Sequence, residues 1–391
     1  MTMPSGDSST PRPGAVIAFL YDLRVGGAET SLLAELREVR ALGLDVSVAY
    51  IGTDETLRPR FERAGIPVHS VRGSSGLSTL RNLVGFLREH RPALVHTSLF
   101  WPDVVVRPVA RLLGIPVLTS LTNEYYGPEH RENSKYGSLG VLAAHLADVV
   151  SSRFATRFHA ISHRVAEVMG RRLLVPPQRI TVIYRGRDLS HLGRRSPERR
   201  AATRASLGLG EETVFLCVGR QDHQKSHDTA VRAFAGLDDP DAVLLLAGRP
   251  GNNTAAIDTA IADAPHSSRI VLLGERSDVA DLLCAADYYV MPSRWEGLSG
   301  ALIEAMALEI PLLVSDLAVF QEVTDTKAWF FTPGDIDACR GVLARALGEP
   351  YPADFIASSR IRAEETFEIG AVAAQMRDLY LAMMGARGET K

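Results

Sequence analysis

The chain has 391 residues, which is too many for one ordinary hydrophobic core and predicts two to three domains. Hydrophobic residues make up 46% and charged residues 23%, a balance that is typical of soluble globular α/β proteins and excludes fibrous and disordered classes. The net charge of −3 is uneven, because residues 1–200 carry 27 basic against 18 acidic residues and residues 201–391 carry 16 against 28.

Residues 1–14 are rich in Ser, Pro, Thr and Gly, which predicts a disordered tail. The apolar run that begins at Val16 is too short for a secretory signal, and no run approaches the roughly 20 apolar residues of a membrane-spanning helix. The three cysteines are far apart and form no metal-binding or disulfide spacing. These features predict a protein of the reducing cytoplasm.

The first half alternates short apolar runs with segments of helical period. Strands are expected over residues 15–21, 45–51, 68–71, 93–96, 117–121 and 157–161. Helices are expected over residues 30–42, 57–64, 77–90, 104–113 and 164–170. This alternation predicts right-handed βαβ units and a mostly parallel sheet.

The second half repeats the pattern, with strands over 213–218, 243–247, 270–273, 288–291 and 311–314 and helices over 227–234, 254–263, 279–285, 300–307 and 336–347. The polar segment 185–211 predicts a domain boundary, which gives domains over 15–190 and 191–370. A last helix over 371–391 is expected to pack back toward the first domain. The fold class is therefore α/β, with two Rossmann-like, doubly wound parallel-sheet domains that face each other across a ligand-binding cleft.

The segment PSRWEGLSGALIEAMALEIP at 292–311 predicts a turn and then a helix from about Gly300. The start of such a helix presents unpaired backbone N–H groups and a positive dipole end to an anion. Glu296 lies in the turn, and Glu304 lies one turn inside the helix, where its carboxylate can accept hydrogen bonds from two ribose hydroxyls. The spacing of eight also fits two surface glutamates that flank a core helix.

A second segment, GRQDHQK at 219–225, follows a predicted strand directly. Arg220 and Lys225 then stand at the carboxyl end of that strand, where two cations can neutralise a diphosphate. A solvated basic loop is the alternative.

A third segment, VGGAE at 25–29, lies between the first predicted strand and the first helix. Gly26 and Gly27 allow the backbone to approach a bound group closely, although a plain structural turn would use the same residues. The longer GxGxxG fingerprint is absent, which disfavours an NAD site.

Together these segments resemble the retaining GT-B glycosyltransferases of family 4, also called glycosyl transferases group 1. The resemblance covers nearly the whole chain and rests on EGLSGALIEAMALEIP, with E-x7-E at Glu296 and Glu304, and on VGRQDHQK. The segments VIYRGRD, LLLAGRPG, VLLGERSDVADLLCAADYYVMPSRWEG and FEIGAVAAQMRDLYLAMM are also similar to that family.

The resemblance implies a nucleotide diphosphate-sugar donor and a hydroxyl acceptor. No residue chooses between UDP and GDP, and a UDP-sugar is expected ahead of a GDP-sugar. It implies that Glu304 binds the ribose and that Arg220 and Lys225 hold the diphosphate. Glu296 would bind the sugar together with the backbone of Gly297, Leu298, Ser299, Gly300 and Ala301. The nucleotide base would lie near Glu275 and Arg276, and Gly26 and Gly27 would approach from the first domain. The catalytic set is then Glu296, Arg220 and Lys225.

The sequence departs from the family at three places. Many relatives have a His after the strand that corresponds to 117–121, whereas this chain reads Leu-Thr-Asn-Glu at 121–124. His96, Asn123 and Glu124 are therefore the acceptor-binding candidates, and His130 is a further nearby histidine. Glu309 and Ser226 stand where relatives commonly have Gly.

No metal and no cofactor are expected. The pairs Asp239/Asp241 and Asp335/Asp337 have the DxD spacing of metal-dependent transferases, but they precede a strand and begin a helix. No nucleic-acid partner is expected. The helix over 77–90 places Arg81, Arg88 and His90 beside leucines, which predicts contact with an anionic membrane or, equally, an ordinary core-facing helix.

Two other functions remain open at this point. One is a catalytically silent subunit that binds a nucleotide sugar in support of a partner enzyme. The other is an epimerase of the same architecture, which would have little use for the E-x7-E helix.

Overall fold

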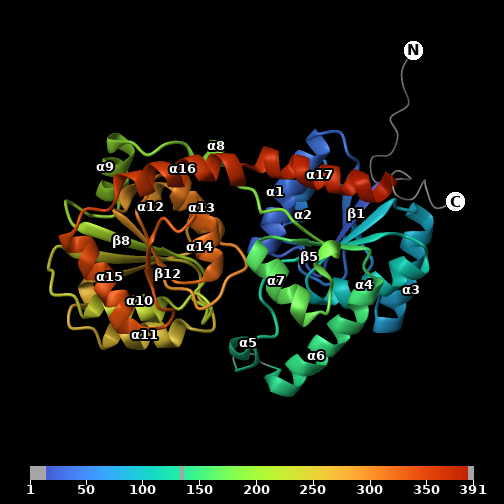
Figure 1. Cartoon of the computed structure of the whole chain (residues 1–391), viewed down its shortest axis with the longest axis horizontal. Coiled ribbons are helices and arrows are strands. Elements are labelled where there is room, and N and C mark those ends of the chain that lie inside the picture. Colours follow the sequence, from blue (N-terminus) through green and yellow to red (C-terminus); the bar gives the residue numbers. More distant parts are fainter. Residues whose placement is uncertain (1–14, 133–135, 386–391) are drawn as a thin grey trace, which may run out of the picture. The chain divides into compact units, whose positions relative to one another are not determined.

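The chain forms two compact units, one of residues Met1–Gly186 with Ile369–Lys391 and one of residues Arg187–Glu368 (Figure 1). We call them unit 1 and unit 2 and describe each by itself. The structure is a computed structural model, and it describes residues 15–132 and 136–385. The predicted tail over 1–14 lies outside the described residues.

Unit 1 contains a seven-stranded sheet in the order β3-β2-β1-β4-β5-β6-β7, in which every pair of neighbours is parallel. Its strands are β1 (Val16–Leu20), β2 (Val46–Tyr50), β3 (Val68–Ser70), β4 (Leu94–Ser98), β5 (Val117–Leu121), β6 (Arg157–Ala160) and β7 (Ile180–Val182). The strand order reverses between β1 and β4. Ligands of such sheets bind at the carboxyl ends of the strands beside that reversal.

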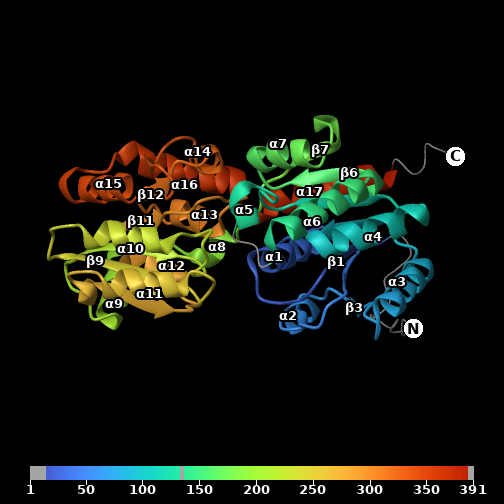
Figure 2. The same ribbon diagram turned by 90° about the horizontal axis from the view of Figure 1, so that it is seen from below.

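Helices cover both faces of this sheet (Figure 2). They are α1 (Gly27–Ala41), α2 (Arg58–Arg63), α3 (Gly76–His90), α4 (Phe100–Leu112), α5 (Pro128–Glu132), α6 (Gly137–Ser151), α7 (His163–Arg172) and α17 (Ile369–Gly385). Successive β1 residues alternate between the two cores, since Val16 and Ala18 pack with α1 and α17 whereas Ile17 and Phe19 pack with α3 and α4. This alternation with period two is the reason that β1 is apolar at every position.

Unit 2 contains a six-stranded parallel sheet in the order β10-β9-β8-β11-β12-β13. Its strands are β8 (Thr213–Val218), β9 (Ala242–Ala247), β10 (Ile270–Gly274), β11 (Tyr288–Met291), β12 (Leu312–Ser315) and β13 (Trp329–Phe331). Here the strand order reverses between β8 and β11, and this reversal marks the edge where the predicted donor-binding segments begin.

The helices of unit 2 are α8 (Leu189–Leu192), α9 (Pro197–Ser206), α10 (His227–Ala235), α11 (Thr254–Ala262), α12 (Val279–Ala285), α13 (Gly300–Ala307), α14 (Ala318–Thr324), α15 (Ile336–Gly348) and α16 (Ala353–Phe367). One face of the sheet packs against α10, α11 and α15, and Figure 1 shows α12 and α13 on the opposite face. Among the described residues, no helix is both long and apolar enough to cross a membrane.

A buried carboxyl group lies in the core that α1 and α17 share. Glu35 of α1 is 6% exposed, and burial raises its pKa to about 7, although Arg185 partly opposes that shift. The same carboxyl group acts on the phenol of Tyr380 in α17, whose pKa is raised mainly by its own burial. We therefore expect the stability of unit 1 to depend on the protonation state of Glu35.

Replacing Glu35 with Gln is expected to stabilise the protein at pH 8 but not at pH 5. The pKa of Glu35 is higher in the folded state than in the unfolded state. The stability that protonated Glu35 contributes to the fold is therefore fully present below about pH 4.5 and is lost as the pH rises through 7. A shift from 4.5 to about 7 corresponds to roughly 3 kcal/mol that the wild type lacks at pH 8 and the variant retains.

Urea unfolding at pH 5 and pH 8 measures this difference. Glu38→Gln on the same helix, whose side chain reaches the surface, is the control and is expected to change the unfolding free energy by less than about 0.5 kcal/mol. An equal effect of Glu35→Gln at both pH values would contradict the prediction.

Candidate functional site

The loop after β8 brings the phosphate-binding candidates to the carboxyl edge of the unit 2 sheet. It touches the loop after β9, because a Cβ atom added to Gly248 would lie 1.8 Å from the carbonyl oxygen of Gly219. The aliphatic part of Lys225 packs over Gly219 at 3.4 Å from the position of an ideal Cβ. Glycine at 248 allows this close approach of backbone to backbone.

Lys225 and Glu296, two predicted catalytic residues that are 71 positions apart, are in contact. The Nζ atom of Lys225 lies 2.6 Å from Oε1 of Glu296, and the Ser293 hydroxyl donates to the same oxygen at 3.0 Å. Glu296 is 5% exposed, whereas the Lys225 side chain is partly exposed. The ammonium group is thus held by a buried carboxylate in the turn that leads to α13.

Arg220 does not join this pair in the structure. Its guanidinium lies 2.6 Å from the carboxylate of Asp222, and more than half of its side chain is exposed. The backbone of the same loop is tied to the turn before α13, because the Arg294 N–H donates to the carbonyl of Gln224 at 2.8 Å. Arg294 is outside the predicted set of site residues, although it lies within the motif that predicts the site.

Helix α13 begins where the sequence predicts it, at Gly300. The Ser299 hydroxyl caps it by accepting from the Leu302 N–H at 3.4 Å, so Gly297, Leu298, Ser299, Gly300 and Ala301 form the approach and first turn of the helix. The guanidinium of Arg187 lies against this turn, since a Cβ atom on Gly300 would fall 1.8 Å from one of its nitrogens. Any larger residue at 300 would displace Arg187.

Glu304 is paired with the same arginine. Its Oε1 lies 3.4 Å from Nε of Arg187, and both side chains are only partly exposed. Burial raises the pKa of Glu304 and lowers the pKa of Arg187, while each charge partly offsets the shift of the other. Arg187 is outside the predicted set, although it belongs to the VIYRGRD segment, which resembles the family.

The two positions where relatives commonly have Gly keep a glycine-like backbone. Ser226 has φ of 50° and Glu309 has φ of 60°, both in the left-handed region that disfavours residues with a side chain. Ser226 precedes α10 and accepts a hydrogen bond from Nε of Arg294 at 3.1 Å. The chain therefore retains the local geometry while it gains a hydroxyl group next to Lys225.

The predicted base-binding residues follow β10. The loop is attached to the neighbouring loop after β9, because the Gly248 N–H donates to the Gly274 carbonyl at 2.7 Å. Arg276 forms a bidentate pair with Asp278 at 2.8 and 2.6 Å, and Glu275 precedes it. This pair orders the loop at the carboxyl edge of the unit 2 sheet.

The remaining candidates belong to unit 1. Gly26 caps α1, and a Cβ atom there would lie 2.3 Å from the carboxylate of Glu29, which folds back over it. Glu29 is buried and lies 3.5 Å from Arg24, whose side chain is largely exposed. Gly27 is the first residue of the helix, and a Cβ atom there would meet no atom within 4 Å.

The acceptor candidates after β5 are held by neighbours in unit 1. Arg164 of α7 donates to Glu124 at 2.9 Å, and the Glu124 N–H donates to Oδ1 of Asn123 at 2.8 Å. His130 lies in α5 beside the ring of Tyr125, at 5.9 Å between ring centroids.

His96 lies inside the sheet, where it is 2% exposed and both ring nitrogens have partners. Four contacts of 2.7 Å run from Tyr380 through His96, Ser120 and His159 to the Ile183 carbonyl. Burial lowers the pKa of His96 to about 3 and that of His159 to about 4, so both rings are neutral at pH 7.

The donor and acceptor of each hydrogen bond in this series follow from its last acceptor, the carbonyl of Ile183. The Ile183 carbonyl can only accept, so Nε2 of His159 donates to it and Nδ1 accepts from the Ser120 hydroxyl. Ser120 then accepts from Nε2 of His96, whose Nδ1 accepts from Tyr380. His96 therefore links the sheet to α17 and presents no unused nitrogen to a ligand.

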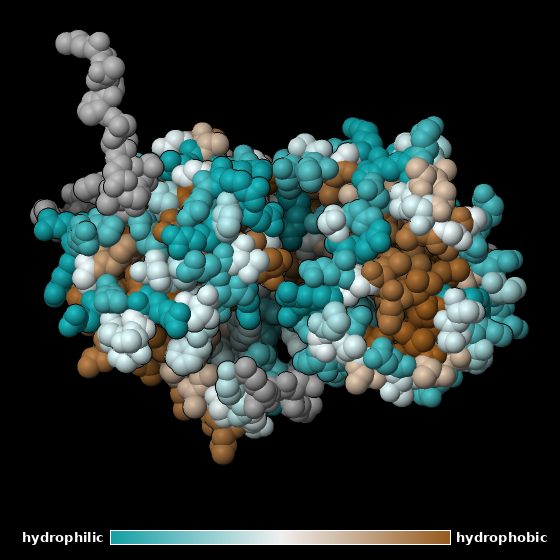
Figure 3. All heavy atoms as spheres, turned by 180° about the vertical axis from the view of Figure 1, so that it is seen from behind, coloured by the Kyte–Doolittle hydropathy of each residue, from teal (hydrophilic) through white to brown (hydrophobic). Residues whose placement is uncertain are grey.

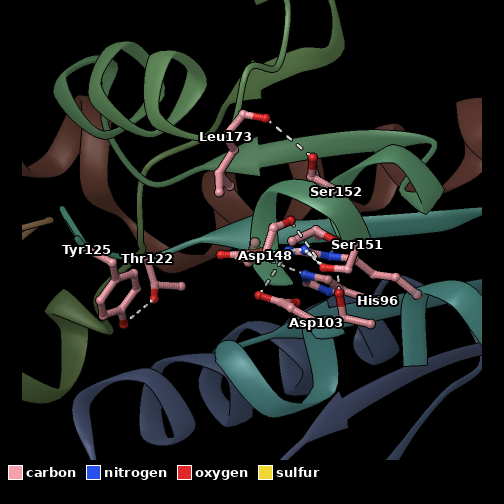
Figure 4. A network of polar contacts seen from close by, with 12 residues as sticks. His96, Asp103, Thr122, Tyr125, Asp148, Ser151, Ser152 and Leu173 are labelled. Carbon is pink, nitrogen blue, oxygen red and sulfur yellow. Dashed lines mark hydrogen bonds and ion pairs between the residues drawn. The ribbon is translucent and has the colours of Figure 1, made fainter. Parts of the chain in front are cut away.

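A buried ionic network lies beside this series of hydrogen bonds. Figure 4 shows Asp103, Asp148 and Ser151 pointing toward one another. Arg107, which is fully buried, lies 3.0 Å from Asp103 and 2.6 Å from Asp148. Its Nε donates to Thr119 at 2.9 Å, which joins α4 and α6 to the sheet. Burial raises the pKa of Asp103 to about 7.

Neither of the two DxD pairs resembles a metal site. Asp335 caps α15 by accepting from the Ala338 N–H at 2.9 Å, and Asp239 accepts from the Asp241 N–H at 2.9 Å. In the part of the chain that the structure describes, no group of His, Cys, Asp and Glu side chains is arranged to hold a metal ion.

Comparison with known proteins shows that both halves of the chain match glycosyltransferase families. Residues 212–348 match the family described as Glycosyl transferases group 1, and residues 25–191 match the family described as Glycosyltransferase Family 4. The UDP-Gal:alpha-D-GlcNAc-diphosphoundecaprenol alpha-1,3-galactosyltransferase of Escherichia coli is 24% identical, over 79% of this chain and 80% of that protein. The 2-deoxystreptamine N-acetyl-D-glucosaminyltransferase of Streptomyces fradiae is 27% identical, over 83% and 82%.

A solved structure has the same fold. Anabaena Alr3699/HepE, determined in complex with UDP-glucose, superposes with a TM-score of 0.83 at 19% identity and covers 94% of this chain and 99% of its own. The predicted fold class of two Rossmann-like parallel-sheet units, as in GT-B enzymes, is thereby confirmed. The chain belongs to the group 1 glycosyltransferases and is a glycosyltransferase enzyme.

Proposed function

We propose that this enzyme transfers a sugar from a nucleotide diphosphate-sugar to a hydroxyl group with retention of configuration and without a metal ion. The donor we propose is a UDP-sugar rather than a GDP-sugar. The observation that carries the proposal is the 2.6 Å contact between Lys225 and Glu296 in the turn that leads into α13.

The departing diphosphate gains negative charge as its bond to the sugar breaks. The ammonium of Lys225 and the unpaired N–H groups at the start of α13 would stabilise that charge, with Arg220 turning from Asp222 toward the phosphate. Because Lys225 and the start of α13 are already held in place by Glu296 and Ser299, Arg220 is the group that has to move when the donor binds. Cations of the protein would thus take the role that a metal ion has in other transferases.

Glu304 would accept hydrogen bonds from the ribose hydroxyls, and Glu296 would do so from the sugar. Burial raises the pKa of Glu304, and the charge of Arg187 opposes that shift and so favours the ionised carboxylate, which accepts hydrogen bonds with both oxygens. Glu275 and Arg276 would border the nucleotide base. UDP is supported by the E. coli relative, whose name gives UDP-Gal as its donor.

Retention would follow from attack on the face that the diphosphate leaves. The bond from the sugar C1 to the phosphate oxygen breaks, the bond from C1 to the acceptor oxygen forms, and the acceptor proton passes to the leaving phosphate. No protein base is then required, which is compatible with a segment after β5 that contains Asn123 and Glu124 but no His. The acceptor would be a glycan, a lipid-linked sugar or a small molecule, and contact with an anionic membrane belongs to the same proposal.

Thermal unfolding with UDP, GDP and ADP in the presence and absence of EDTA tests the donor. UDP at 100 times its dissociation constant should stabilise the fold by about 2.7 kcal/mol and raise the melting temperature equally with EDTA. A shift with GDP alone would overturn the choice of UDP. A shift that requires added Mg²⁺ would overturn metal independence.

A catalytically silent, donor-binding subunit is the second candidate, and the observation that favours it is that residues 121–124, at the end of β5, contain no histidine. Hydrolysis of the donor by the purified protein separates the two functions. An enzyme should release the sugar slowly into water, whereas a silent subunit should show the thermal shift without any release.

A further inference from the structure

Helix α6 exposes a row of apolar side chains, whereas a helix at a protein surface normally buries them. Leu139, Leu142, Leu146 and Val150 are 82%, 44%, 58% and 64% exposed. At 100° per residue these four positions fall within about 80° of one another around the helix, so they form a single stripe. Ala143, also exposed, lies in the same stripe, and we call these five residues the α6 face.

Asp148, Ser151 and His145 of α6 point inward instead, and Ser138 is its exposed polar residue. Asp148 is 4% exposed and pairs with Arg107, and Ser151 accepts a hydrogen bond from the same arginine at 3.1 Å. His145 is partly buried and contacts the Arg172 carbonyl at 2.7 Å. All 15 residues of α6 are described, and none is an exposed charged residue. A helix that faces water normally has the opposite arrangement.

Exposed cations border the α6 face. Arg153 follows the carboxyl end of the helix, and Arg157 begins β6 a few residues later. The hydrogen bond between His145 and Arg172 places the end of α7 beside α6. There Arg171 is largely exposed, although it pairs with Glu167 at 2.7 Å, and Leu174 is 61% exposed. Unit 1 as a whole holds 25 Lys and Arg against 18 Asp and Glu, a net charge of +7.

We infer that the α6 face is a membrane-docking surface that inserts its apolar stripe among the acyl chains of an anionic phospholipid bilayer. An apolar stripe bordered by arginines matches the boundary between headgroups and acyl chains, because the leucines leave water while the guanidinium groups meet anionic headgroups. Apolar side chains project at the lower edge in Figure 3, which is the edge where Figure 1 places α6. The inference gives the proposed membrane contact a definite location.

A second copy of this chain is a less suitable partner for the α6 face than a bilayer is. A helix of 15 residues is ~22 Å long, and a stripe ~10 Å wide on it offers on the order of 220 Å², well below the roughly 800 Å² that each partner buries in a stable complex. Bilayer insertion needs no matching protein surface.

Helix α3, for which the sequence leaves membrane contact and an ordinary core-facing role equally open, is less suited to membrane contact. Its Leu83 and Leu87 are buried in the core with Phe19 and Val95, which leaves Leu77 and Leu80 as its exposed leucines. The apolar side of α3 is therefore already used for folding.

Flotation of the full chain with vesicles of phosphatidylglycerol and phosphatidylcholine, and with phosphatidylcholine alone, tests the inference. The wild type should bind the anionic vesicles, and its affinity for vesicles should fall at least tenfold when the anionic lipid is omitted. Leu142→Glu with Leu146→Glu should weaken binding at least tenfold, and Arg153→Glu with Arg157→Glu should weaken it several-fold.

Two controls locate the surface. Ile361→Glu on α16 of unit 2, where Ile361 is 55% exposed, and Leu77→Glu on α3 should bind as the wild type does. Circular dichroism should give the same melting temperature for all variants, since each replaces an exposed residue.

The inference is overturned if the wild type binds no vesicles, if the α6 variants bind equally well, or if Leu77→Glu alone abolishes binding. Sedimentation velocity adds a further outcome, because a dimer that Leu142→Glu with Leu146→Glu dissociates would assign the α6 face to a second copy. Vesicle binding needs neither donor nor acceptor, so failure of the proposed donor chemistry and failure of this inference are observed separately.

Discussion

Replacing Lys225 with Met is expected to lower the turnover number of glycosyl transfer by about 10²- to 10³-fold, which corresponds to roughly 3–4 kcal/mol of transition-state stabilisation. Met keeps the aliphatic stem that packs over Gly219 but removes the ammonium that contacts Glu296. The proposed chemistry needs that charge most when the diphosphate departs. The loss should therefore appear in the turnover number more than in the Michaelis constant for the donor.

Initial rates with the donor identified by thermal shift measure this effect. Lys327→Met, which removes the same charge at another site of unit 2, is the matched control and should keep the wild-type turnover. Thermal unfolding of both variants shows whether Glu296 without its partner destabilises the fold. A Lys225→Met enzyme that is folded and turns over within threefold of the wild type would contradict the role of Lys225.

Replacing Arg107 with Met is expected to destabilise unit 1 by roughly 3–5 kcal/mol. Arg107 is fully buried and contacts both Asp103 and Asp148, so its loss leaves two carboxyl groups inside unit 1 without a cation. The same change removes the hydrogen bond to Thr119 that ties α4 to the sheet. The expected loss of unfolding free energy arises because buried charges are left without a partner. It is therefore larger than the net stabilisation that the intact network provides.

Chemical unfolding at pH 7 measures the difference in unfolding free energy. Arg111→Met is the control on the same helix, and because Arg111 is exposed we expect a change within about 0.5 kcal/mol. Adding Asp103→Asn and Asp148→Asn to Arg107→Met should recover part of the loss, since the buried charges are then absent. An Arg107→Met variant as stable as Arg111→Met would show that the network contributes nothing.

Local patterns in the sequence predict the strands closely. The strand predicted over 213–218 has the bounds of β8, and that over 288–291 has the bounds of β11, because a buried parallel strand is a short apolar run between turn residues. The helix predicted from Gly300 also begins there. These elements depend on residues that are neighbours in the sequence.

The elements outside the prediction have long-range causes. Helix α9 is polar and arginine-rich, and it docks through Arg204, which donates to Ala285 at 3.0 Å and to Asp287 at 2.6 Å. The start of α4, four residues before the predicted start, has a local reason instead, because Pro102 lies in the first turn, where its missing N–H costs nothing. Helix α6 is outside the prediction because its polar residues face the core.

The contacts in the candidate site also divide into those that the sequence predicts and those that it does not. The motif spacing predicts that Lys225, Glu296 and Glu304 serve one region of unit 2, and the structure brings Lys225 and Glu296 into contact. Arg187 reaches α13 from a distant segment, and nothing in the spacing of the motifs indicates that contact.

Hydrophobic period, turn residues and the order of motifs are properties of adjacent residues, and they are enough to predict two parallel-sheet domains and the glycosyltransferase family. The ionic partner of each charge and the side of each helix that faces water depend on side chains brought together from distant segments. For that reason the pairing of Arg187 with Glu304, the interior position of His96 and the outward leucines of α6 emerge only when the chain is folded.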